Sequence, residues 1–457
     1  MSESLSVVVL AAGQGVRMQS EMPKVLHTIG GKPLLAHVIE DAEALNAERI
    51  VVVYGHGGEQ VQAALAGKNI HWVEQEQQLG TGHALAQALP ALDDDHTILL
   101  LYGDVPLISV ETLRTLVQTA SDNCLALLTA ELDDPSGYGR IVRDGAGNVQ
   151  CIIEQKDASP EQLAIREINT GMLAVKAKPL RQWVSQLKND NAQSEYYLTD
   201  IVGFAVADGV GVQTTRPSSL IEIEGVNNKY QLAELERAYQ QRRAKHFMQA
   251  GLTLRDPARF DVRGELAFGK DVAIDINVLL EGDVVLGNDI SIGPNCCLKN
   301  AIVGDGTIIE ANCVIEDSRI GANCNIGPFA RLRPETTLAD SVKVGNFVEV
   351  KKSTIASGSK VNHLSYVGDT TMGSNVNVGA GTITCNYDGA NKHQTIIGDN
   401  VFIGSDTQLV APVTLGDGAT IGAGSTITQD APENALSLSR VKQTTREGWK
   451  RPIKDKK

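Results

Sequence analysis

The stretch IGDNVFIGSDTQLVAPVTLGDGATIGAGSTI, residues 397–427, places an aliphatic residue at every sixth position, often followed by glycine. The same interval recurs earlier in the chain, between Leu286-Gly287 and Ile292-Gly293, Ile320-Gly321 and Ile326-Gly327, and Met372-Gly373 and Val378-Gly379. A period of six is typical of a hexapeptide β-helix, in which aliphatic side chains point inward and stack from coil to coil. An antiparallel sandwich would show period two instead. The repeat therefore predicts a left-handed parallel β-helix over residues 251–437.

Three segments interrupt this repeat and carry most of its chemically active side chains. They are RLRPETTLADSVKVGNFVEVKKS (331–353), KVNHLSYVG (360–368) and TCNYDGANKHQT (384–395). Interruptions of a solenoid usually leave the coil as loops on one face. We therefore expect loops at these places and a functional site among them.

Residues 1–226 follow a different pattern, in which short apolar runs alternate with helix-like segments. The clearest runs are SVVVL (6–10), RIVVVYG (49–55), TILLLYG (97–103) and CLALLTA (124–130), and the clearest helical spacing is in PLLAHVIEDAEAL (33–45) and GHALAQALPAL (82–92). Such alternation predicts a Rossmann-like α/β domain with a mainly parallel sheet covered on both faces. Ligands bind beyond the carboxyl ends of the strands in such sheets.

A long helix is expected between the two patterns. NNKYQLAELERAYQQRRAKHFMQA, residues 227–250, opens with asparagine, keeps helical spacing and stops before Gly251, which are the start and stop signals of a helix. The predicted organisation is an α/β domain over 1–226, a linker helix over 227–250, the β-helix over 251–437 and a basic tail over 438–457.

The bulk composition argues against several classes of protein. The chain of 457 residues has a formal net charge of −14, the wrong sign for a general nucleic-acid binder. Its N-terminus lacks the features of a signal peptide, and no apolar run approaches the ~20 residues of a membrane helix. Its seven cysteines form no CxxC pair, which favours buried thiols over a zinc site. We expect a reduced, cytoplasmic protein without membrane insertion.

A glycine-containing loop, LAAGQGVRM (10–18), directly follows the first apolar run. Backbone N–H groups in such a loop can face an anion, and Arg17 and Lys24 could complement phosphate charge. A tight strand–helix turn is the alternative, and the third glycine of the dinucleotide fingerprint is missing. The loop alone therefore does not decide between the two.

Other residues at strand ends favour the phosphate site. Asp104 in LLLYGDVPL ends a strand, where its carboxylate could hold Mg²⁺ between phosphates, although a solvated loop acid is the alternative. Gly80-Thr81-Gly82 forms a second glycine loop, with Gln75 before it. The ensemble LAAGQGVRM … PKVL … GTGHA … YGDVPL resembles the sugar-nucleotidyltransferase family, whose members join a sugar 1-phosphate to a nucleoside triphosphate. One departure is Val16, where the family commonly has threonine.

This resemblance implies roles for individual residues of the N-terminal half. The uridine nucleotide would contact Leu10, Ala11, Ala12, Gly13, Tyr102 and Gly103, with Arg17 and Lys24 on its phosphates. Uracil would be read by Gln75, Gly80 and Thr81, and the N-acetylglucosamine unit would be held by Gly139, Glu154 and Asn169. Asp104 and Asn227 would be the Mg²⁺ ligands, and Asn227 would also contact the sugar.

The second half resembles the hexapeptide acyltransferases, which implies a second site. His363 would be the catalytic base, because imidazole titrates near working pH; an exposed loop histidine is the alternative. Glucosamine 1-phosphate would be held by Arg333, Glu349, Lys351, Tyr366, Asn377 and Lys392. Acetyl-CoA would be bound by Ala380, Asn386, Tyr387, Ser405, Ala423 and Arg440.

Together the two resemblances imply a bifunctional enzyme. It would acetylate glucosamine 1-phosphate from acetyl-CoA and then join the product to UTP with Mg²⁺, giving UDP-N-acetylglucosamine for the bacterial cell envelope. The resemblance also implies a homotrimer with acyl sites between neighbouring β-helices. Two alternatives stay open: a nucleotidyltransferase whose β-helix only regulates or oligomerises, and a non-enzymatic scaffold that binds sugar nucleotides.

Overall fold

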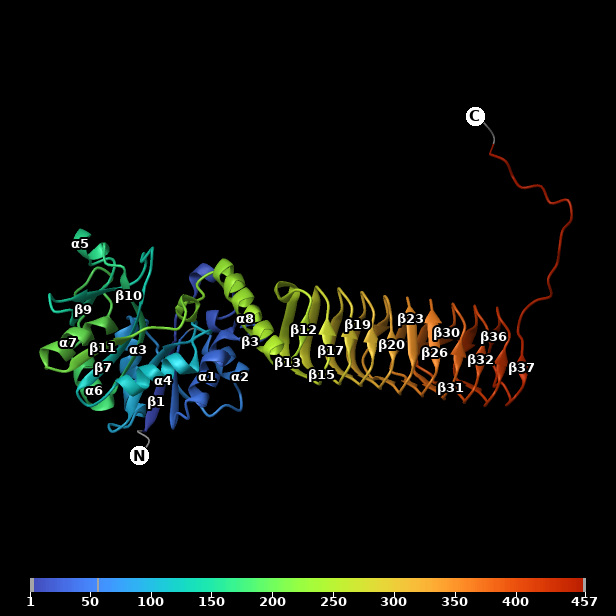
Figure 1. The fold of residues 1–457 in the computed structure, drawn as a ribbon, viewed down its shortest axis with the longest axis horizontal. Coiled ribbons are helices and arrows are strands. Elements are labelled where there is room, and N and C mark those ends of the chain that lie inside the picture. The colour runs from blue at the N-terminus through green and yellow to red at the C-terminus, as the bar shows by residue number, and fades with distance from the viewer. Residues whose placement is uncertain (1–3, 56, 455–457) are drawn as a thin grey trace. The chain divides into compact units, whose positions relative to one another are not determined.

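Two compact units make up the chain, Met1–Tyr239 and Gln240–Lys457, and Figure 1 shows the α/β character of the first and the repeated coils of the second. The computed structural model describes residues 4–55 and 57–454. The division between the units falls inside helix α8 (Lys229–Gln249), the helix predicted over 227–250. The assignment of uridyl transfer to the first unit and of acetyl transfer to the second stays a prediction.

The first unit is built on one sheet with the strand order β11-β7-β10-β6-β1-β4-β5. These strands are β1 (Leu5–Ala11), β4 (Arg49–Tyr54), β5 (His71–Glu74), β6 (Thr97–Tyr102), β7 (Cys124–Glu131), β10 (Glu167–Lys176) and β11 (Gly211–Thr215). Strand β1 pairs in parallel with β4 and β6, and β7 pairs in parallel with β11. The predicted, mainly parallel sheet is therefore confirmed.

One strand departs from that direction. Strand β10 runs antiparallel to both β6 and β7, and it also pairs with the hairpin of β8 (Arg140–Arg143) and β9 (Val149–Ile153). The register between β10 and β7 shifts between Asn169 and Leu173. This irregularity lies where β10 reaches a cavity described below.

Helices cover both faces of the sheet, so its strands are apolar on both sides. In β1, Val7 and Val9 belong to one core and Val8 and Leu10 to the other. The helices are α1 (Leu34–Ala44), α2 (Gly58–Ala64), α3 (Thr81–Ala88), α4 (Val110–Thr119), α5 (Pro160–Leu163), α6 (Ala177–Val184) and α7 (Ile201–Ala207). Short 3-10 turns lie at 16–18, 24–26, 89–91, 198–200 and 220–223, and β2 (Thr28–Ile29) pairs with β3 (Lys32–Pro33).

The predicted capping of α8 is confirmed. The Asn228 side chain accepts a hydrogen bond from the backbone N–H of Gln231, and Gly251 takes a φ of +107° just after the helix. Within the first unit, Leu235 of α8 packs in a small core with Met18, Ile29 and Leu34. That packing fixes the segment containing Asn227 on the first unit.

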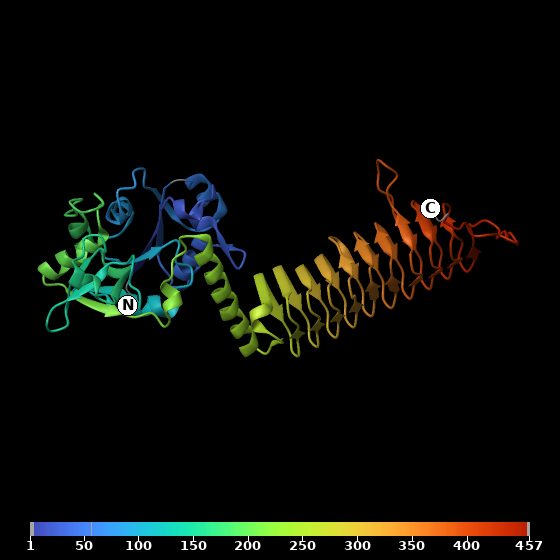
Figure 2. The same ribbon diagram turned by 90° about the horizontal axis from the view of Figure 1, so that it is seen from above.

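The second unit is a parallel β-helix whose coils follow one another in Figure 2. One sheet is formed by β12 (Thr253–Leu254), β14 (Ala273–Ile274), β16 (Ser291–Ile292), β18 (Ile308–Ile309), β20 (Asn325–Ile326), β23 (Lys343–Asn346), β26 (Lys360–His363), β29 (Asn377–Val378), β32 (Phe402–Ile403), β35 (Thr420–Ile421) and β37 (Leu436–Ser437). Every pairing along this sheet is parallel.

The other two faces of the coils belong to one continuous sheet. The long strands β13 (Phe260–Phe268), β15 (Val278–Leu286), β17 (Cys297–Val303) and β19 (Val314–Ile320) begin it. Beyond β19 it divides into β21 (Arg331–Leu332), β24 (Glu349–Lys351), β27 (Tyr366–Gly368), β30 (Ile383–Cys385), β33 (Gln408–Val410) and β36 (Thr426–Ile427) on one face, and β22 (Thr336–Leu338), β25 (Thr354–Ile355), β28 (Thr370–Met372), β31 (Thr395–Ile397) and β34 (Val413–Leu415) on the other.

The aliphatic positions of the repeat form the core of this unit. Ile397, Ile403, Leu415, Ile421 and Ile427 are all buried, and Val378, Ile403 and Ile421 stand opposite one another on successive coils. This stacking confirms the β-helix predicted from the period of six.

The predicted loops are correct at one interruption and wrong at the other two. Within the segment 384–395, residues 386–394 leave the coil as a hairpin between β30 and β31, which projects from the coils in Figure 2. Residues 331–353 and 360–368 stay within regular coils, because Leu332, Val350 and Val367 continue the inward column in register. Polar residues in those segments occupy outward positions without disturbing the core.

Among residues 4–55 and 57–454, no helix is long and apolar enough to cross a membrane. All seven cysteines are free thiols.

Candidate functional site

A cavity of about 510 Å³ opens at the carboxyl ends of β1 and β6 in the first unit. Its walls contain many of the residues predicted for the nucleotide: Leu10, Ala11, Ala12, Gly13, Lys24, Gln75, Gly80, Thr81, Tyr102 and Asp104. Gly103 lies behind this lining, where its N–H donates to the carbonyl of Leu10. The position of the cavity agrees with the rule that open α/β sheets bind ligands at strand carboxyl ends.

Two glycines allow the walls to approach one another. Gly15 has a φ of +62°, and a Cβ there would lie 2.8 Å from the Cβ of Lys24. Gly80 has a φ of +106°, and a Cβ there would lie 2.8 Å from the carbonyl oxygen of Tyr196. A side chain at either position would be strained and would clash with Lys24 or with the backbone of Tyr196.

Lys24, Asp104 and Asn227 converge at the edge of this cavity. The ammonium of Lys24 forms an ion pair with the carboxylate of Asp104, and its Nζ lies 3.5 Å from Oδ1 of Asn227. The guanidinium of Arg17 donates to the same Oδ1 at 2.9 Å. The predicted phosphate-binding cations and the two predicted metal ligands are therefore in direct contact.

A smaller cavity of about 210 Å³ contains the three residues predicted to hold the sugar. Gly139, Glu154 and Asn169 line it, and it shares Thr81 and Tyr102 with the larger cavity. Burial raises the pKa of the Glu154 carboxyl, against the effect of a hydrogen bond that Oε1 accepts from the Thr199 hydroxyl. The pKa of Tyr102 is also raised, chiefly by burial and then by Asp104.

Several lining residues were missed by sequence reasoning. Gln14, Gln78 and Glu195 line the larger cavity, and Tyr138 and Gly171 line the smaller one. Gln78 donates from Nε2 to the carbonyl of Ala12 at 2.6 Å, which ties the glycine loop to a segment far away in sequence. Gln14 lies inside the quoted loop LAAGQGVRM, where only its neighbours were assigned a role, and the positions of the other four depend on the packing of distant segments.

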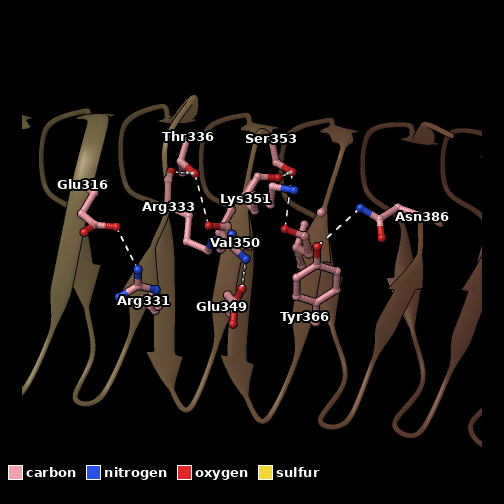
Figure 3. Close-up of polar contacts among 12 residues, drawn as sticks. Glu316, Arg331, Arg333, Thr336, Glu349, Val350, Lys351, Ser353, Tyr366 and Asn386 are labelled. Carbon is pink, nitrogen blue, oxygen red and sulfur yellow. Dashed lines mark hydrogen bonds and ion pairs between the residues drawn. The ribbon is translucent and has the colours of Figure 1, made fainter. Parts of the chain in front are cut away.

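Part of the second predicted site lies on successive coils of the β-helix, where Figure 3 shows Arg333, Glu349, Lys351, Tyr366 and Asn386. Arg333 donates from Nη1 to Oε1 of Glu349 at 2.8 Å, and Glu349 stands opposite Tyr366 in the register of β24 and β27. The neighbouring ammonium of Lys351 is the main cause that lowers the pKa of Lys392. Two ammonium groups held together in this way favour binding of an anion between them.

Asn386 lies on the coil after that of Tyr366 and forms hydrogen bonds back to the earlier coil. Its amide donates to the hydroxyl of Tyr366 at 3.4 Å and to the carboxylate of Asp369. Tyr387 lies mostly exposed on the projecting hairpin, where its hydroxyl donates to the carbonyl of Gly389. Asp369 was not among the predicted residues, although it is linked to Asn386 and also raises the pKa of Lys392.

His363 ends β26, and its ring contacts a residue that the sequence did not indicate. Nδ1 lies 3.2 Å from Oδ1 of Asn346, its partner in the register of β23 and β26.

The residues predicted to bind acetyl-CoA follow His363 at the same corner of successive coils. They are Ala380, Ser405 and Ala423, as backbone hydrogen bonds from Gly381, Asp406 and Gly424 show. Arg440 donates to the carbonyl of Ala423 at 2.9 Å. Asn377 lies earlier, on β29, opposite Lys360.

The same corner carries an exposed apolar column. Phe329, Phe347 and Leu364 have φ values of +55°, +54° and +49° and are 49%, 56% and 62% exposed. The rings of Phe329 and Phe347 stack with centroids 5.1 Å apart. Other coils place Asn295, Asn312 and Asp406 at left-handed corners, which is the choice that this backbone conformation favours.

No group of three or more His, Cys, Asp or Glu side chains that could hold a metal exists among residues 4–55 and 57–454. A Mg²⁺ site of one carboxylate and one amide is compatible with that finding, because Mg²⁺ in phosphate-transfer sites takes its other ligands from water and substrate. The oxygens of Asp104 and Asn227 fit such a cation, since both already face the Nζ of Lys24.

Family models match both halves of the chain. The MobA-like NTP transferase domain matches residues 7–188, the GMPPB C-terminal domain matches 262–346, and six repeats of the bacterial transferase hexapeptide match 394–429. With the fold, these matches define the class of protein as a nucleotidyltransferase joined to a hexapeptide-repeat transferase.

Curated relatives match the chain over nearly its whole length. The bifunctional protein GlmU of Methylococcus capsulatus is 59% identical over 451 residues, covering 98% of each chain. GlmU of Marinobacter nauticus is 58% identical and covers 98% of this chain and 99% of its own; GlmU of Aromatoleum aromaticum is 59% identical and covers 99% of both. The chain belongs to the GlmU family of bifunctional proteins.

Proposed function

We propose that this chain makes UDP-N-acetylglucosamine by two reactions at two separate sites. The β-helix transfers an acetyl group from acetyl-CoA to glucosamine 1-phosphate. The α/β unit then transfers a uridylyl group from UTP to the N-acetylglucosamine 1-phosphate, releasing pyrophosphate. The observation that carries the proposal is the convergence of Lys24, Asp104 and Asn227 beside a cavity at the strand ends.

The uridyl transfer needs positioning and charge neutralisation rather than a general base, because a sugar phosphate is already a charged oxygen nucleophile. Arg17 and Lys24 supply positive charge for the phosphates of UTP, and the loop 11–18 supplies backbone N–H groups. Gly139, Glu154 and Asn169 hold the sugar in the adjoining cavity. This arrangement orients the sugar phosphate toward the α-phosphate.

Asp104 and Asn227 would hold the Mg²⁺ ion of this reaction. When bound, the ion neutralises charge on the phosphates of the nucleotide and the leaving pyrophosphate. Lys24 contacts both residues in the described structure. Its ammonium can therefore remain close to the phosphates when the two oxygens take up a cation.

His363 would be the base of the acetyl transfer. If Nδ1–H donates to Oδ1 of Asn346, the lone pair of Nε2 is available to take a proton from the attacking amine. The amine nitrogen bonds to the thioester carbon, its proton passes to Nε2, and the carbon–sulfur bond of acetyl-CoA breaks. Arg333, Lys351 and Lys392 would hold the phosphate of the amino sugar.

The homotrimer belongs to this proposal. Phe329, Phe347 and Leu364 combine exposure with a backbone conformation that disfavours bulky side chains, at a cost of about 1–3 kcal/mol each. Packing of a second copy against this corner would bury the column beside His363. The exposed column thus supports an acyl site completed by a neighbouring chain. A cytoplasmic location, where UTP and acetyl-CoA are supplied, is part of the same proposal.

A single reaction mixture tests both activities and their order. The purified chain is incubated with glucosamine 1-phosphate, acetyl-CoA, UTP and Mg²⁺, and free thiol and pyrophosphate are followed together. Thiol release should come first, and pyrophosphate should depend on acetyl-CoA. Pyrophosphate formed only from added N-acetylglucosamine 1-phosphate, without thiol release, would make the β-helix non-catalytic.

A further inference from the structure

Three side chains are linked in a row beside the nucleotide cavity. Gln75, which follows β5, is only 4% exposed, and its Nε2 lies 3.2 Å from the carbonyl oxygen of Gly80 and 3.0 Å from Nδ1 of His83. One turn further along α3, the amide of Gln87 lies 3.2 Å from Nε2 of His83. An imidazole therefore stands between two amides, one of which lines the cavity.

The carbonyl of Gly80 determines how the amide of Gln75 must be oriented. A carbonyl oxygen only accepts hydrogen bonds, so the amide group facing it must be the nitrogen. The second N–H of that nitrogen points to Nδ1 of His83, which must then be the unprotonated ring nitrogen. The ring proton is consequently on Nε2. A half-turn of the Gln87 amide gives this N–H an oxygen acceptor and gives up the long 3.5 Å contact between Nε2 of Gln87 and the carbonyl of His83.

Both N–H groups of Gln75 are used by this arrangement. Within the part of the chain that the structure describes, its Oε1 has no hydrogen-bond partner. The side chain can therefore offer a bound base only an acceptor. Uracil carries an N–H at ring position 3, whereas cytosine carries an unprotonated nitrogen there, which would face Oε1 with a second acceptor.

We propose that His83 is a positioning residue that, together with the Gly80 carbonyl, fixes the Gln75 amide and thereby strengthens the preference for uridine over cytidine nucleotides. The inference rests on the proposed uridyl transfer and names the residue that enforces its base specificity. Without the acceptor on His83, the second N–H of a buried amide lacks a partner. The amide is then held only by its 3.2 Å hydrogen bond to the Gly80 carbonyl, so turning it to donate to the ring nitrogen of cytosine costs one hydrogen bond instead of two.

The test compares His83→Leu with His83→Asn. The Oδ1 of asparagine can occupy the position of Nδ1 and accept from Gln75, whereas leucine cannot. The measured quantity is the ratio of kcat/KM for UTP to kcat/KM for CTP, with N-acetylglucosamine 1-phosphate and Mg²⁺. We expect His83→Leu to lower this ratio about tenfold, through a higher KM for UTP at unchanged kcat, and His83→Asn to keep it.

Folding of each variant is checked by its thermal unfolding. His83→Ala removes the acceptor without adding an apolar chain and should give the same loss as leucine. An unchanged ratio in folded His83→Leu or His83→Ala would overturn the inference, as would an equal loss in His83→Asn. Absence of uridyl transfer in the unaltered chain would instead contradict the proposed function itself.

Discussion

At Glu154 the burial that forms the sugar cavity works against ionisation of the carboxyl. Its folded-state pKa is raised above the ordinary value of 4.5, mainly by burial. A raised carboxyl pKa means that ionisation costs more in the folded than in the unfolded chain. Stability is therefore lost as the pH rises from about 4.5 through the raised pKa. Because ionised Glu154 lowers the stability of the fold, we explain its presence by binding of the sugar.

Replacing Glu154 with glutamine should remove this pH-dependent loss. Glutamine is close in shape and can still accept from the Thr199 hydroxyl. The melting temperature of Glu154→Gln should rise relative to the unaltered chain as the pH increases from 4 to 8, while KM for N-acetylglucosamine 1-phosphate increases. A difference in melting temperature that stays constant over this pH range would contradict the assignment.

Glu349 has a different role from Glu154, because its ion pair with Arg333 lies at the surface. Both side chains are 38% exposed, and such pairs contribute about 0–1 kcal/mol to stability. Glu349→Gln should therefore change the free energy of unfolding by less than about 1 kcal/mol.

The larger effect of Glu349→Gln should be on binding of the amino sugar. Arg333 would lose its charged partner and its fixed orientation, so KM for glucosamine 1-phosphate should increase about threefold to tenfold. Steady-state kinetics of acetyl transfer measure this value. Uridyl transfer in the same sample serves as the control. A large loss of stability with unchanged KM would make the pair structural instead.

The residues that sequence reasoning missed share a physical reason. Asn346 contacts His363 and Asp369 contacts Asn386 through side chains on different coils, and the Gln78 side chain donates to the backbone carbonyl of Ala12. The period of six predicted the stacked coils, and the position after a strand predicted Asp104, because both are local properties of the chain. Which side chains meet across coils depends on register, which the sequence alone did not supply.

At the scale of elements, strand direction and loop placement were the weakest predictions. Alternation of apolar runs and helices predicted a mainly parallel sheet, but nothing local distinguished the antiparallel β10 from its neighbours. Residues 331–353 and 360–368 were expected to leave the coil, because the polar residues at their outward positions make the period of six hard to recognise. Inward Leu332, Val350 and Val367 keep them in it.

The corner column of the β-helix leads to a prediction about assembly. Phe347 is exposed, stacks on Phe329 and directly follows Asn346, the partner of His363. Phe347→Asp should convert the proposed trimer to smaller species and lower acetyl transfer at least tenfold, because an unpaired carboxylate would have to be buried in the proposed interface. Sedimentation velocity gives the oligomeric state.

Phe347→Tyr is the matched control, since it keeps an aromatic ring at the same backbone position. It should retain both the assembly and the acetyl transfer, and uridyl transfer should persist in both variants. A trimer that survives Phe347→Asp would place the interface elsewhere on the β-helix. A monomeric variant with full acetyl transfer would show that one chain forms the whole acyl site.

At the scale of the whole molecule, the two groups of predicted site residues belong to different compact units. Lys24, Asp104 and Asn227 lie in the first, and Arg333, His363 and Lys392 lie in the second. Each unit has its own core, and the cores share no residue. Loss of one reaction by a substitution at its site should therefore leave the other reaction intact.

The most direct test of two independent sites measures both reactions in His363→Ala and in Asp104→Ala. His363→Ala should lose acetyl transfer at least a hundredfold, as expected for a general base, with normal uridyl transfer from supplied N-acetylglucosamine 1-phosphate. Asp104→Ala should show the opposite pattern. Survival of acetyl transfer in His363→Ala, or loss of both reactions in either folded variant, would contradict two independent catalytic sites.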